Sequence, residues 1–297
     1  MNAPRSDRVV VGVDGSQESM QAVRWAGVEA ARLCVPLRLV RVFGWTDEVV
    51  AGHQGLGDHY REILLRQARA GLEAAAELAT QRHPGLTVEP DLVLGHPIGV
   101  LVDESRHARL LVVGDRGLSR IGSLVAGSVA VAMAAHASCP VVVVRGAESP
   151  ALATMPVVVG VDGTPASEAA IPFAFAAASA RGVPLIAVHA WSGVIADVEY
   201  AAIVDWDAMA EEHEELLAER LAGWSEKYPD VHVDRVVSRS GAVRRLLDLS
   251  ASAQLVVVGS RGHAEFAGIV LGSVSNVLVH RAACPVAVIR PATSDGG

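Results

Sequence analysis

The sequence predicts an α/β protein of two tandem domains, each a five-stranded parallel sheet with helices on both faces. The first observation is an internal repeat: VVVGVDGS at Val9 to Ser16 returns as VVVGVDGT at Val157 to Thr164. The second is that short, continuously apolar runs alternate with helical patterns in each half, which is typical of buried parallel strands. The third is a length of 297 residues, which gives each half enough chain to bury its own core.

In the first half, strands are expected where Val and Leu run together, and helices where Ala, Leu, Glu and Arg recur at helical spacing. Ser16 is expected to cap the first helix, and His83-Pro84-Gly85 to end the second. The expected strands are Arg8 to Asp14, Leu37 to Val42, Thr87 to Val93, Leu110 to Val113 and Val141 to Val144. The expected helices are Gln17 to Arg32, Asp58 to Arg82, Gly99 to His107 and Ser128 to Ala137.

The second half repeats this order, with helices expected near Ala166 to Arg181, Ala208 to Tyr228 and Ala242 to Ala253. A short segment rich in Ala, Pro, Ser and Glu separates the halves. The sequence therefore predicts a first domain at residues 1–146, a linker at 147–156 and a second domain at 157–297.

Composition and charge exclude several classes of protein. A net charge of −8 argues against a nucleic-acid or anionic-membrane surface, since both bind concentrated positive charge. No stretch of about 20 uncharged apolar residues is present, and Met1 to Asp7 does not resemble a signal peptide. We therefore expect a cytoplasmic protein with no membrane or nucleic-acid partner.

Cysteine and lysine usage excludes further chemistry. The three cysteines, Cys34, Cys139 and Cys284, form no CxxC pair, so neither a disulfide framework nor a zinc ribbon is expected. Lys227 is the only lysine and lies in an expected helix end, which argues against a P-loop or a Schiff base. The sequence also has no GxGxxG after the first strand, no GxSxG and no HExxH.

One glycine motif occurs in both halves. Gly114-Asp115-Arg116-Gly117 is followed after nine residues by Gly127-Ser128, and Gly259-Ser260-Arg261-Gly262 is followed after nine residues by Gly272-Ser273. Glycines after a strand let the backbone approach a ligand, and the helix that follows offers free N–H groups to an anion. This indicates a phosphate cradle built twice. The structural alternative is tight strand-to-helix packing with a serine cap.

Charged residues near the motif also have two interpretations. Arg116, Arg120 and Arg261 would supply positive charge to a polyphosphate, or they are solvated loop arginines. Asp14 and Asp162, which end the first strand of each repeat, would accept a hydrogen bond from an adenine amino group or a ribose hydroxyl. Alternatively they form an Asx-type turn before the next helix, and one geometry serves both roles.

Together, the VDG[ST] strand end, the G-2x-G-9x-G-S spacing and the Cys-Pro-Val elements at Cys139 and Cys284 resemble the universal stress protein family, in its tandem, ATP-binding branch. The resemblance covers about Arg8 to Arg290. It implies that a nucleotide lies across the first-strand Asp, the end of the second strand and the glycine loop of each domain. A homodimer is also expected from it.

The resemblance implies two adenine-nucleotide sites, in which Ser128 and Ser273 hold phosphates and backbone groups at Val42 and Ala190 meet the adenine edge. The first site comprises Gly12, Asp14, Val42, Gly114, Asp115, Arg116, Gly117, Arg120, Gly127, Ser128 and Val129. The second comprises Gly160, Asp162, Ala190, Gly259, Ser260, Arg261, Gly262, Gly272, Ser273 and Val274. Asp115, where the other half has Ser260, and Glu265, where the other half has Arg120, place acids near phosphate, so occupancy is expected to differ.

The expected function is ATP binding, with or without Mg²⁺, in which the nucleotide is a sensing or regulatory ligand of a stress response. No catalytic or metal-ligating residue is assigned. The alternatives are a slow Mg-dependent ATPase or phosphotransferase acting through Asp14 or Asp162, a cAMP-binding protein, and a scaffold with vestigial sites. The sequence does not choose between ATP and cAMP.

Tryptophans mark one further pair of segments. Trp45 precedes Thr46 to Gly57, and Trp191 and Trp206 flank Val194 to Asp207. Both segments follow the second strand of a repeat. They are expected either to cover a nucleotide as lids or to pack against other parts of the protein.

Overall fold

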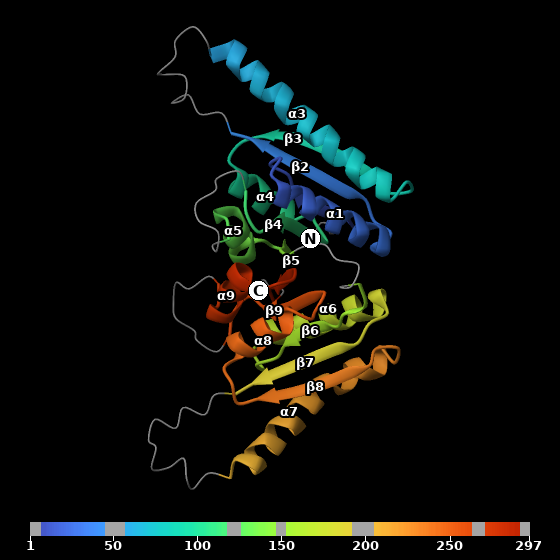
Figure 1. Cartoon of the computed structure of the whole chain (residues 1–297), viewed down its shortest axis with the longest axis vertical. Helices are drawn as coiled ribbons and strands as arrows, with labels where there is room; N and C mark the ends of the chain where they lie inside the picture. Colours follow the sequence, from blue (N-terminus) through green and yellow to red (C-terminus); the bar gives the residue numbers. More distant parts are fainter. Residues whose placement is uncertain are drawn as a thin grey trace, which may run out of the picture. The chain divides into compact units, whose positions relative to one another are not determined.

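The protein was analysed as a computed structural model, which describes residues 7–44, 57–117, 126–146, 153–191, 205–262 and 271–291. The chain divides into two compact units, Met1–Arg145 and Gly146–Gly297. Each unit is an α/β domain with one parallel five-stranded sheet, and both have the same order of elements (Figure 1). The predicted fold class is confirmed.

The first domain has the strand order β3-β2-β1-β4-β5. Its neighbouring strands all pair in parallel. Its elements are β1 (Val9–Gly12), α1 (Gln17–Leu33), β2 (Leu37–Phe43), α3 (Gly57–Arg82), β3 (Val88–Leu94), α4 (Pro97–Ser105), β4 (Leu110–Gly114), α5 (Ser128–His136) and β5 (Val141–Val144).

The second domain has the corresponding order β8-β7-β6-β9-β10, again with parallel pairing. Its elements are β6 (Val157–Gly160), α6 (Pro165–Arg181), β7 (Leu185–Ala190), α7 (Trp206–Lys227), β8 (Val233–Ser238), α8 (Ala242–Ser250), β9 (Leu255–Gly259), α9 (Ser273–Arg281) and β10 (Val286–Ile289).

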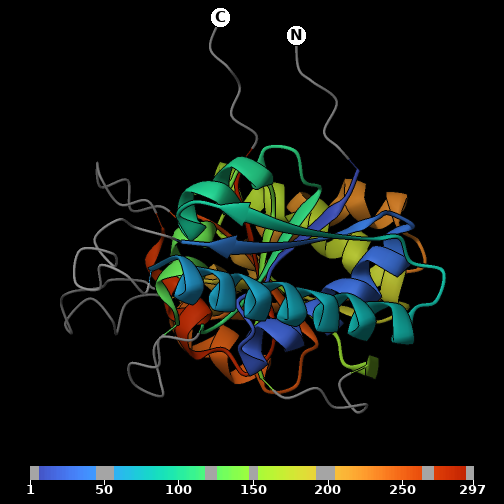
Figure 2. The same cartoon turned by 90° about the horizontal axis from the view of Figure 1, so that it is seen from above.

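The strand order determines where the helices lie. The chain runs from β1 outward to β3 and then returns to β4, and right-handed crossovers place helices of the two directions on opposite faces. Accordingly α1 packs on α3 and α4 packs on α5. Figure 2 shows α3 and α4 on opposite sides of β2 and β3. The order reverses between β1 and β4, and between β6 and β9, so a crevice for ligands is expected at the carboxyl ends of these strands.

The central strands form the core of each sheet. Val9, Val10 and Val11 of β1 are fully buried, as are Val157 and Val158 of β6. Burial on both faces explains why these strands are continuously apolar rather than alternating. The thiols Cys139 and Cys284 are also buried, at 3% and 1% exposure, as small apolar residues beside the last strands.

Some element boundaries differ from those expected. Helix α4 begins at Pro97 rather than Gly99, because proline is well accommodated in the first turn of a helix. It ends at Ser105, whose hydroxyl donates to the Val102 carbonyl at 2.6 Å and accepts from the Ser138 N–H at 2.9 Å. Ser250 ends α8 in the same way, so α8 stops short of Ala253. These serines tie the end of α4 to the segment after α5 and the end of α8 to the segment after α9.

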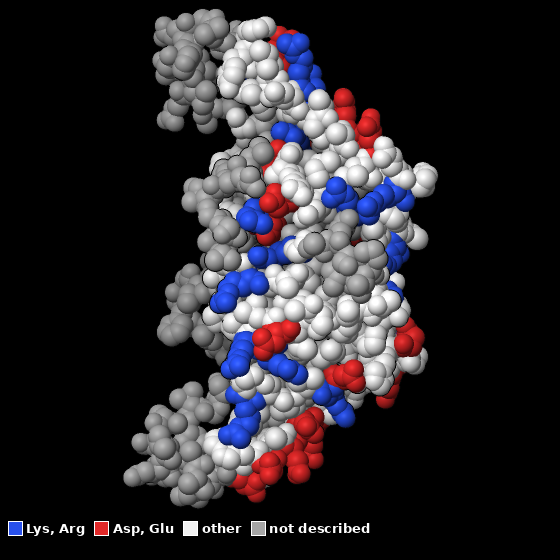
Figure 3. All heavy atoms as spheres, viewed as in Figure 1, with Lys and Arg blue, Asp and Glu red and all other residues white. Residues whose placement is uncertain are grey.

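Charged side chains of both signs are interspersed over the face shown in Figure 3, and acidic side chains gather over α7. Helix α7 carries five glutamates between Glu211 and Glu219. In the part of the chain that the structure describes, no helix is both long and apolar enough to cross a lipid bilayer.

Alanine at Gly114 or Gly259 is expected to destabilise its domain by about 1–3 kcal/mol, the usual cost of overpacking. A Cβ atom at Gly114 would lie 2.8 Å from the backbone carbon of Glu18, and one at Gly259 would lie 2.7 Å from that of Ala166. Denaturant unfolding measures the change. Gly223→Ala is the control: this exposed position in α7 has open space around it, so alanine is expected to stabilise by about 0.5–1 kcal/mol. Unchanged unfolding midpoints for the first two variants would contradict the close contact.

Candidate functional site

The turn after the first strand of each domain is built by an aspartate. Asp14 Oδ1 accepts from the Ser16 N–H at 2.9 Å and from the Ser16 hydroxyl at 2.6 Å. The Ser16 hydroxyl oxygen in turn accepts from the Ser19 N–H and caps α1, as predicted. Asp162 makes the same turn with Thr164, at 3.0 and 2.7 Å. In each domain, one carboxylate oxygen of the aspartate therefore forms the Asx-type turn that the sequence analysis gave as one of two interpretations.

The second carboxylate oxygen faces the glycine loop. A Cβ atom at Gly117 would lie 2.6 Å from Asp14 Oδ2, and one at Gly262 would lie 3.0 Å from Asp162 Oδ2. These glycines are therefore needed for the loop to pass the aspartate. The structure thus brings together, in each domain, two motifs that lie about a hundred residues apart in the sequence.

In each domain a backbone hydrogen bond joins the two ends of the glycine motif. The Gly127 N–H donates to the Asp115 carbonyl, and the Gly272 N–H donates to the Ser260 carbonyl, both at 2.7 Å. Gly127 and Gly272 are extended N-caps with no side-chain cap bond. The first N–H groups of α5 and α9 have no partner within their helices, which favours an anion there.

Ser128 and Ser273 are the first residues of α5 and α9, and both are exposed. Neither serine is the N-cap. The structural alternative, tight strand-to-helix packing with a serine cap, is therefore wrong about the cap. Both serines belong to the helix turn whose N–H groups have no partner within the helix. A phosphate seated on that turn would be within reach of both kinds of donor.

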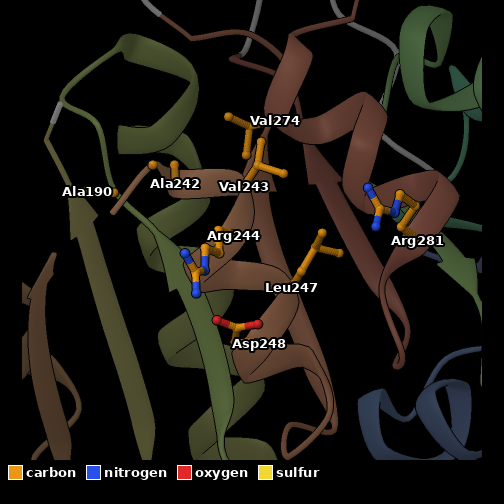
Figure 4. Close-up of a pocket in the computed structure, with 9 residues that line it drawn as sticks. Ala190, Ala242, Val243, Arg244, Leu247, Asp248, Val274 and Arg281 are labelled. Atoms are coloured by element: carbon orange, nitrogen blue, oxygen red, sulfur yellow. The ribbon is translucent and has the colours of Figure 1, made fainter. Parts of the chain in front are cut away.

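A pocket of about 720 Å³ lies against the end of β7 and helices α8 and α9. It includes two residues of the predicted second site, Ala190 at the end of β7 and Val274 in the first turn of α9 (Figure 4). Sequence reasoning missed the rest of its wall, although the small-residue turn Ser240-Gly241-Ala242 at the carboxyl end of β8 signals it. The remaining lining residues are Gly241, Ala242, Val243, Arg244, Leu247, Asp248 and Arg281.

The first glycine loop carries its own acid. Asp115 is buried, with Oδ2 at 3.5 Å from Arg116 Nε and 3.6 Å from an Arg145 Nη atom. Arg116 also lies 3.8 Å from Glu18 of α1. Arg145 was not predicted as a site residue, although the repeat of the last strand ends on arginine in both halves, at Arg145 and Arg290.

The second glycine loop has serine in place of that acid. Ser260 is 1% exposed, and its hydroxyl has no hydrogen-bond partner among the described residues. Burial lowers the pKa of Arg290, and the positive charge of Arg261 lowers it further. The corresponding positions of the two loops therefore differ in charge.

An arginine braces the aspartate turn in each domain, but it comes from different elements. In the first domain Arg41 of β2 lies against Gly15, where a Cβ atom would be 2.9 Å from its guanidinium. Burial lowers the pKa of Arg41, although Asp14 opposes this shift. In the second domain Arg220 of α7 lies against Gly163 and forms an ion pair with Glu168 of α6.

His189 occupies the position of Arg41 in the second domain. Its Nδ1 lies 2.8 Å from the Val161 carbonyl, and because a carbonyl only accepts, Nδ1 carries the proton. Its Nε2 lies 3.1 Å from His213 Nδ1. His189, to which the sequence analysis assigned no role, is buried beside the Asp162 turn.

Trp191 and Trp206 pack on each other, with ring centroids 6.0 Å apart. Trp191 also stacks on His213 at 4.8 Å, and the Arg239 guanidinium lies 3.9 Å from the Trp206 centroid. Packing is therefore one role of these tryptophans.

The segments expected to act as lids are 46–57 and 194–207. Of these, 46–56 and 194–204 lie outside the described residues, as do Trp45, Arg120 and Glu265.

The remaining predicted residues lie around the same strand ends. Gly12 and Gly160 face Leu101 and Leu246, where a Cβ atom would be 3.2 Å from a leucine methyl, so they are packing positions. Val42 lies in β2 near its carboxyl end and Val129 in the first turn of α5. Within the described ranges, no group of three or more His, Cys, Asp or Glu residues is arranged to hold a metal ion.

These features define a class of protein: a duplicated α/β fold with a glycine loop and a helix N-terminus at each topological switch point. The model of the family described as "Universal stress protein family" matches residues 5–145 and 154–290. The chain therefore belongs to the universal stress protein family.

One relative and one solved structure, each matched over nearly the whole chain, also carry the name of this family. The chain is 42% identical over 300 residues to Universal stress protein Rv2005c of Mycobacterium tuberculosis, covering 98% of this chain and 99% of that protein. The crystal structure of a universal stress protein from Archaeoglobus fulgidus DSM 4304 matches with a TM-score of 0.69 and 20% identity, covering 96% and 98% of the two chains. This likeness concerns the fold.

Two single-domain-sized matches were solved with adenine nucleotides. A universal stress protein in complex with cAMP matches 47% of this chain and 97% of its own, with 29% identity and a TM-score of 0.35. The universal stress protein from Archaeoglobus fulgidus in complex with dAMP matches 46% and 96%, with 25% identity and a TM-score of 0.34.

The stability of the second domain is expected to fall as the pH drops below about 6.5, the ordinary pKa of histidine. Burial and the neighbouring His189 lower the pKa of His213, so the unfolded chain takes up the proton before the folded domain does. His213 thus contributes stability above its unfolded pKa, and this is lost as the pH falls through its lowered folded pKa. Denaturant titrations followed by tryptophan fluorescence from pH 8 to 5 measure the effect.

His213→Gln is expected to reduce the slope of the unfolding free energy against pH. The reduction corresponds to less than about one bound proton, since one partly exposed group titrates. The matched control is His136→Gln, at an exposed position of α5 in the first domain. An identical pH slope in wild type and His213→Gln would show that the His189–His213 pair does not control the transition.

Proposed function

We propose that this universal stress protein binds ATP and that the bound nucleotide is a regulatory or sensing ligand in a stress response. The observation that carries the proposal is a convergence in the second domain. The Asp162 turn, the Gly262 loop and the first turn of α9 meet at one switch point, and a pocket lined by Ala190 and Val274 lies against the first turn of α9.

The pocket suits a nucleoside. Its volume of about 720 Å³ lies within the usual range for small-molecule sites. Ala190, Val243 and Leu247 give it apolar surface for a base, and the Asp162 turn offers a carboxylate to a ribose hydroxyl. The adjoining N-terminus of α9, with Ser273 exposed, suits phosphate. Mg²⁺ would arrive with the polyphosphate, since it is often held by phosphates and one or two carboxylates.

A regulatory role is favoured over catalysis by the state of the two aspartates. Asp14 and Asp162 each accept two hydrogen bonds from the following residue at one carboxylate oxygen. Such bonds hold the carboxylate in one orientation, which suits a structural anchor better than a general base. The proposed protein is a cytoplasmic homodimer. Each chain has a first domain at residues 1–146, a linker at 147–156 and a second domain at 157–297.

Native mass spectrometry of the purified protein, followed by denaturation and identification of released small molecules, tests the proposal. ATP is expected to be released or, after stripping, to rebind on titration. The double variant Gly117→Ala, Gly262→Ala is expected to weaken ATP binding at least about ten-fold, because each Cβ atom would displace the aspartate from the loop. The matched control, Gly85→Ala with Gly223→Ala, places methyl groups in open space. No adenine-nucleotide binding by wild type would refute the proposal.

Hydrolysis separates the enzyme alternative. With Mg²⁺ or Mn²⁺, ATP turnover is expected to stay at background, and Asp14→Ala with Asp162→Ala is expected not to change it. Turnover above background that this double variant abolishes would favour the ATPase. Competition by cAMP at concentrations below those of ATP would instead favour a single-phosphate ligand, which one helix N-terminus can also hold.

A further inference from the structure

The two phosphate loops differ at both positions that surround the loop arginine. In the first domain Arg116 has carboxylates on two sides, Asp115 at 3.5 Å and Glu18 at 3.8 Å. In the repeat, Asp115 corresponds to Ser260 and Glu18 corresponds to Ala166. Both acids are thus replaced by neutral residues around Arg261.

Asp115 is also held from its other side. Its carboxylate lies 3.6 Å from Arg145 at the end of β5, and its side chain is 8% exposed. Buried carboxylates are stable only when paired, and here two arginines provide the pairing. This carboxylate therefore supplies, from within the chain, negative charge that a phosphate would otherwise bring to the loop.

In the described part of the second loop, residues 259–262, no such internal anion is present, and Glu265 lies outside it. Among the described residues, no ion pair joins Arg261 to a carboxylate. Its positive charge acts on Arg290, the counterpart of Arg145, and the two cations repel each other. A bound anion would relieve this repulsion.

The buried hydroxyl of Ser260 is a second, independent observation. It lies at the base of the loop, is 1% exposed and has no hydrogen-bond partner in the described residues. A buried polar atom without a partner costs free energy, and water or a ligand commonly provides one. The corresponding group of the first domain is the paired Asp115 carboxylate.

We propose that the two nucleotide sites are unequal: the second domain binds nucleotide phosphates tightly through Arg261, whereas Asp115 and Glu18 weaken phosphate binding in the first domain. This rests on the proposed function, and it assigns which site fills first. Asp115 thus lowers the phosphate affinity of the first domain, whereas the neutral Ser260 at the corresponding position of the second domain does not oppose a phosphate.

Titration of nucleotide-stripped protein with ATP, followed by native mass spectrometry, counts nucleotides per chain. Wild type is expected to show one tight and one weak site, separated by at least about ten-fold, which is the worth of one charge-assisted contact. Ser260→Asp is expected to weaken the tight site by a similar factor. Asp115→Ser is expected to strengthen the weak site, which a merely damaged fold would not do.

Two matched controls carry the same chemical changes elsewhere. Ser252→Asp adds an acid at an exposed position after α8, and Asp103→Ser removes an exposed acid from α4. Both are expected to leave the two affinities unchanged. Circular dichroism establishes that each variant is folded.

Two equal sites in wild type, or a tight site that survives in folded Ser260→Asp, would overturn the inequality while leaving nucleotide binding intact. Loss of the tight site in Asp115→Ser instead would assign it to the first domain and overturn the proposal. Wild type that binds no adenine nucleotide at all would refute the proposed function, and this inference with it.

Discussion

The backbone contact between the end of β4 and the first turn of α1 is the constraint on which each site depends. Gly114 lies so close to Glu18 that no side chain fits between them, and Gly259 lies equally close to Ala166. This contact holds the N-terminus of α1 or α6 against the neighbouring strand. The aspartate turn that precedes the helix is thereby placed beside the glycine loop that follows the strand, so one short contact aligns the two motifs.

Much of this arrangement could be predicted because it follows from local patterns. Continuous apolar runs gave the strands, and the duplicated spacing located both loops after the fourth strand of each domain. The capping role of Ser16 followed from its place before a helical pattern. The parallel order then required the ends of β1 and β4 to share an edge of the sheet, which brings Asp14 and Gly117 together.

What could not be predicted depends on contacts between distant side chains. The pairing of Asp115 with Arg145 requires the register of β4 and β5, which apolar runs alone do not specify. The pocket wall from α8 depends on how that helix packs beside α9, and its apolar residues look like ordinary core residues in the sequence. The histidine pair joins β7 to α7, and no spacing rule relates those positions.

The change of bracing arginine has a mechanical consequence. In the first domain Arg41 belongs to the sheet, so the support of the Gly15 turn is as rigid as β2 itself. In the second domain Arg220 reaches the Gly163 turn from α7, a helix on the surface of the domain. A displacement of α7 would therefore be transmitted through one side chain to the Asp162 turn. In the second domain the arginine thus belongs to the outer helix itself, whereas in the first domain it is anchored in β2 and only lies against Gly71 of the outer helix α3.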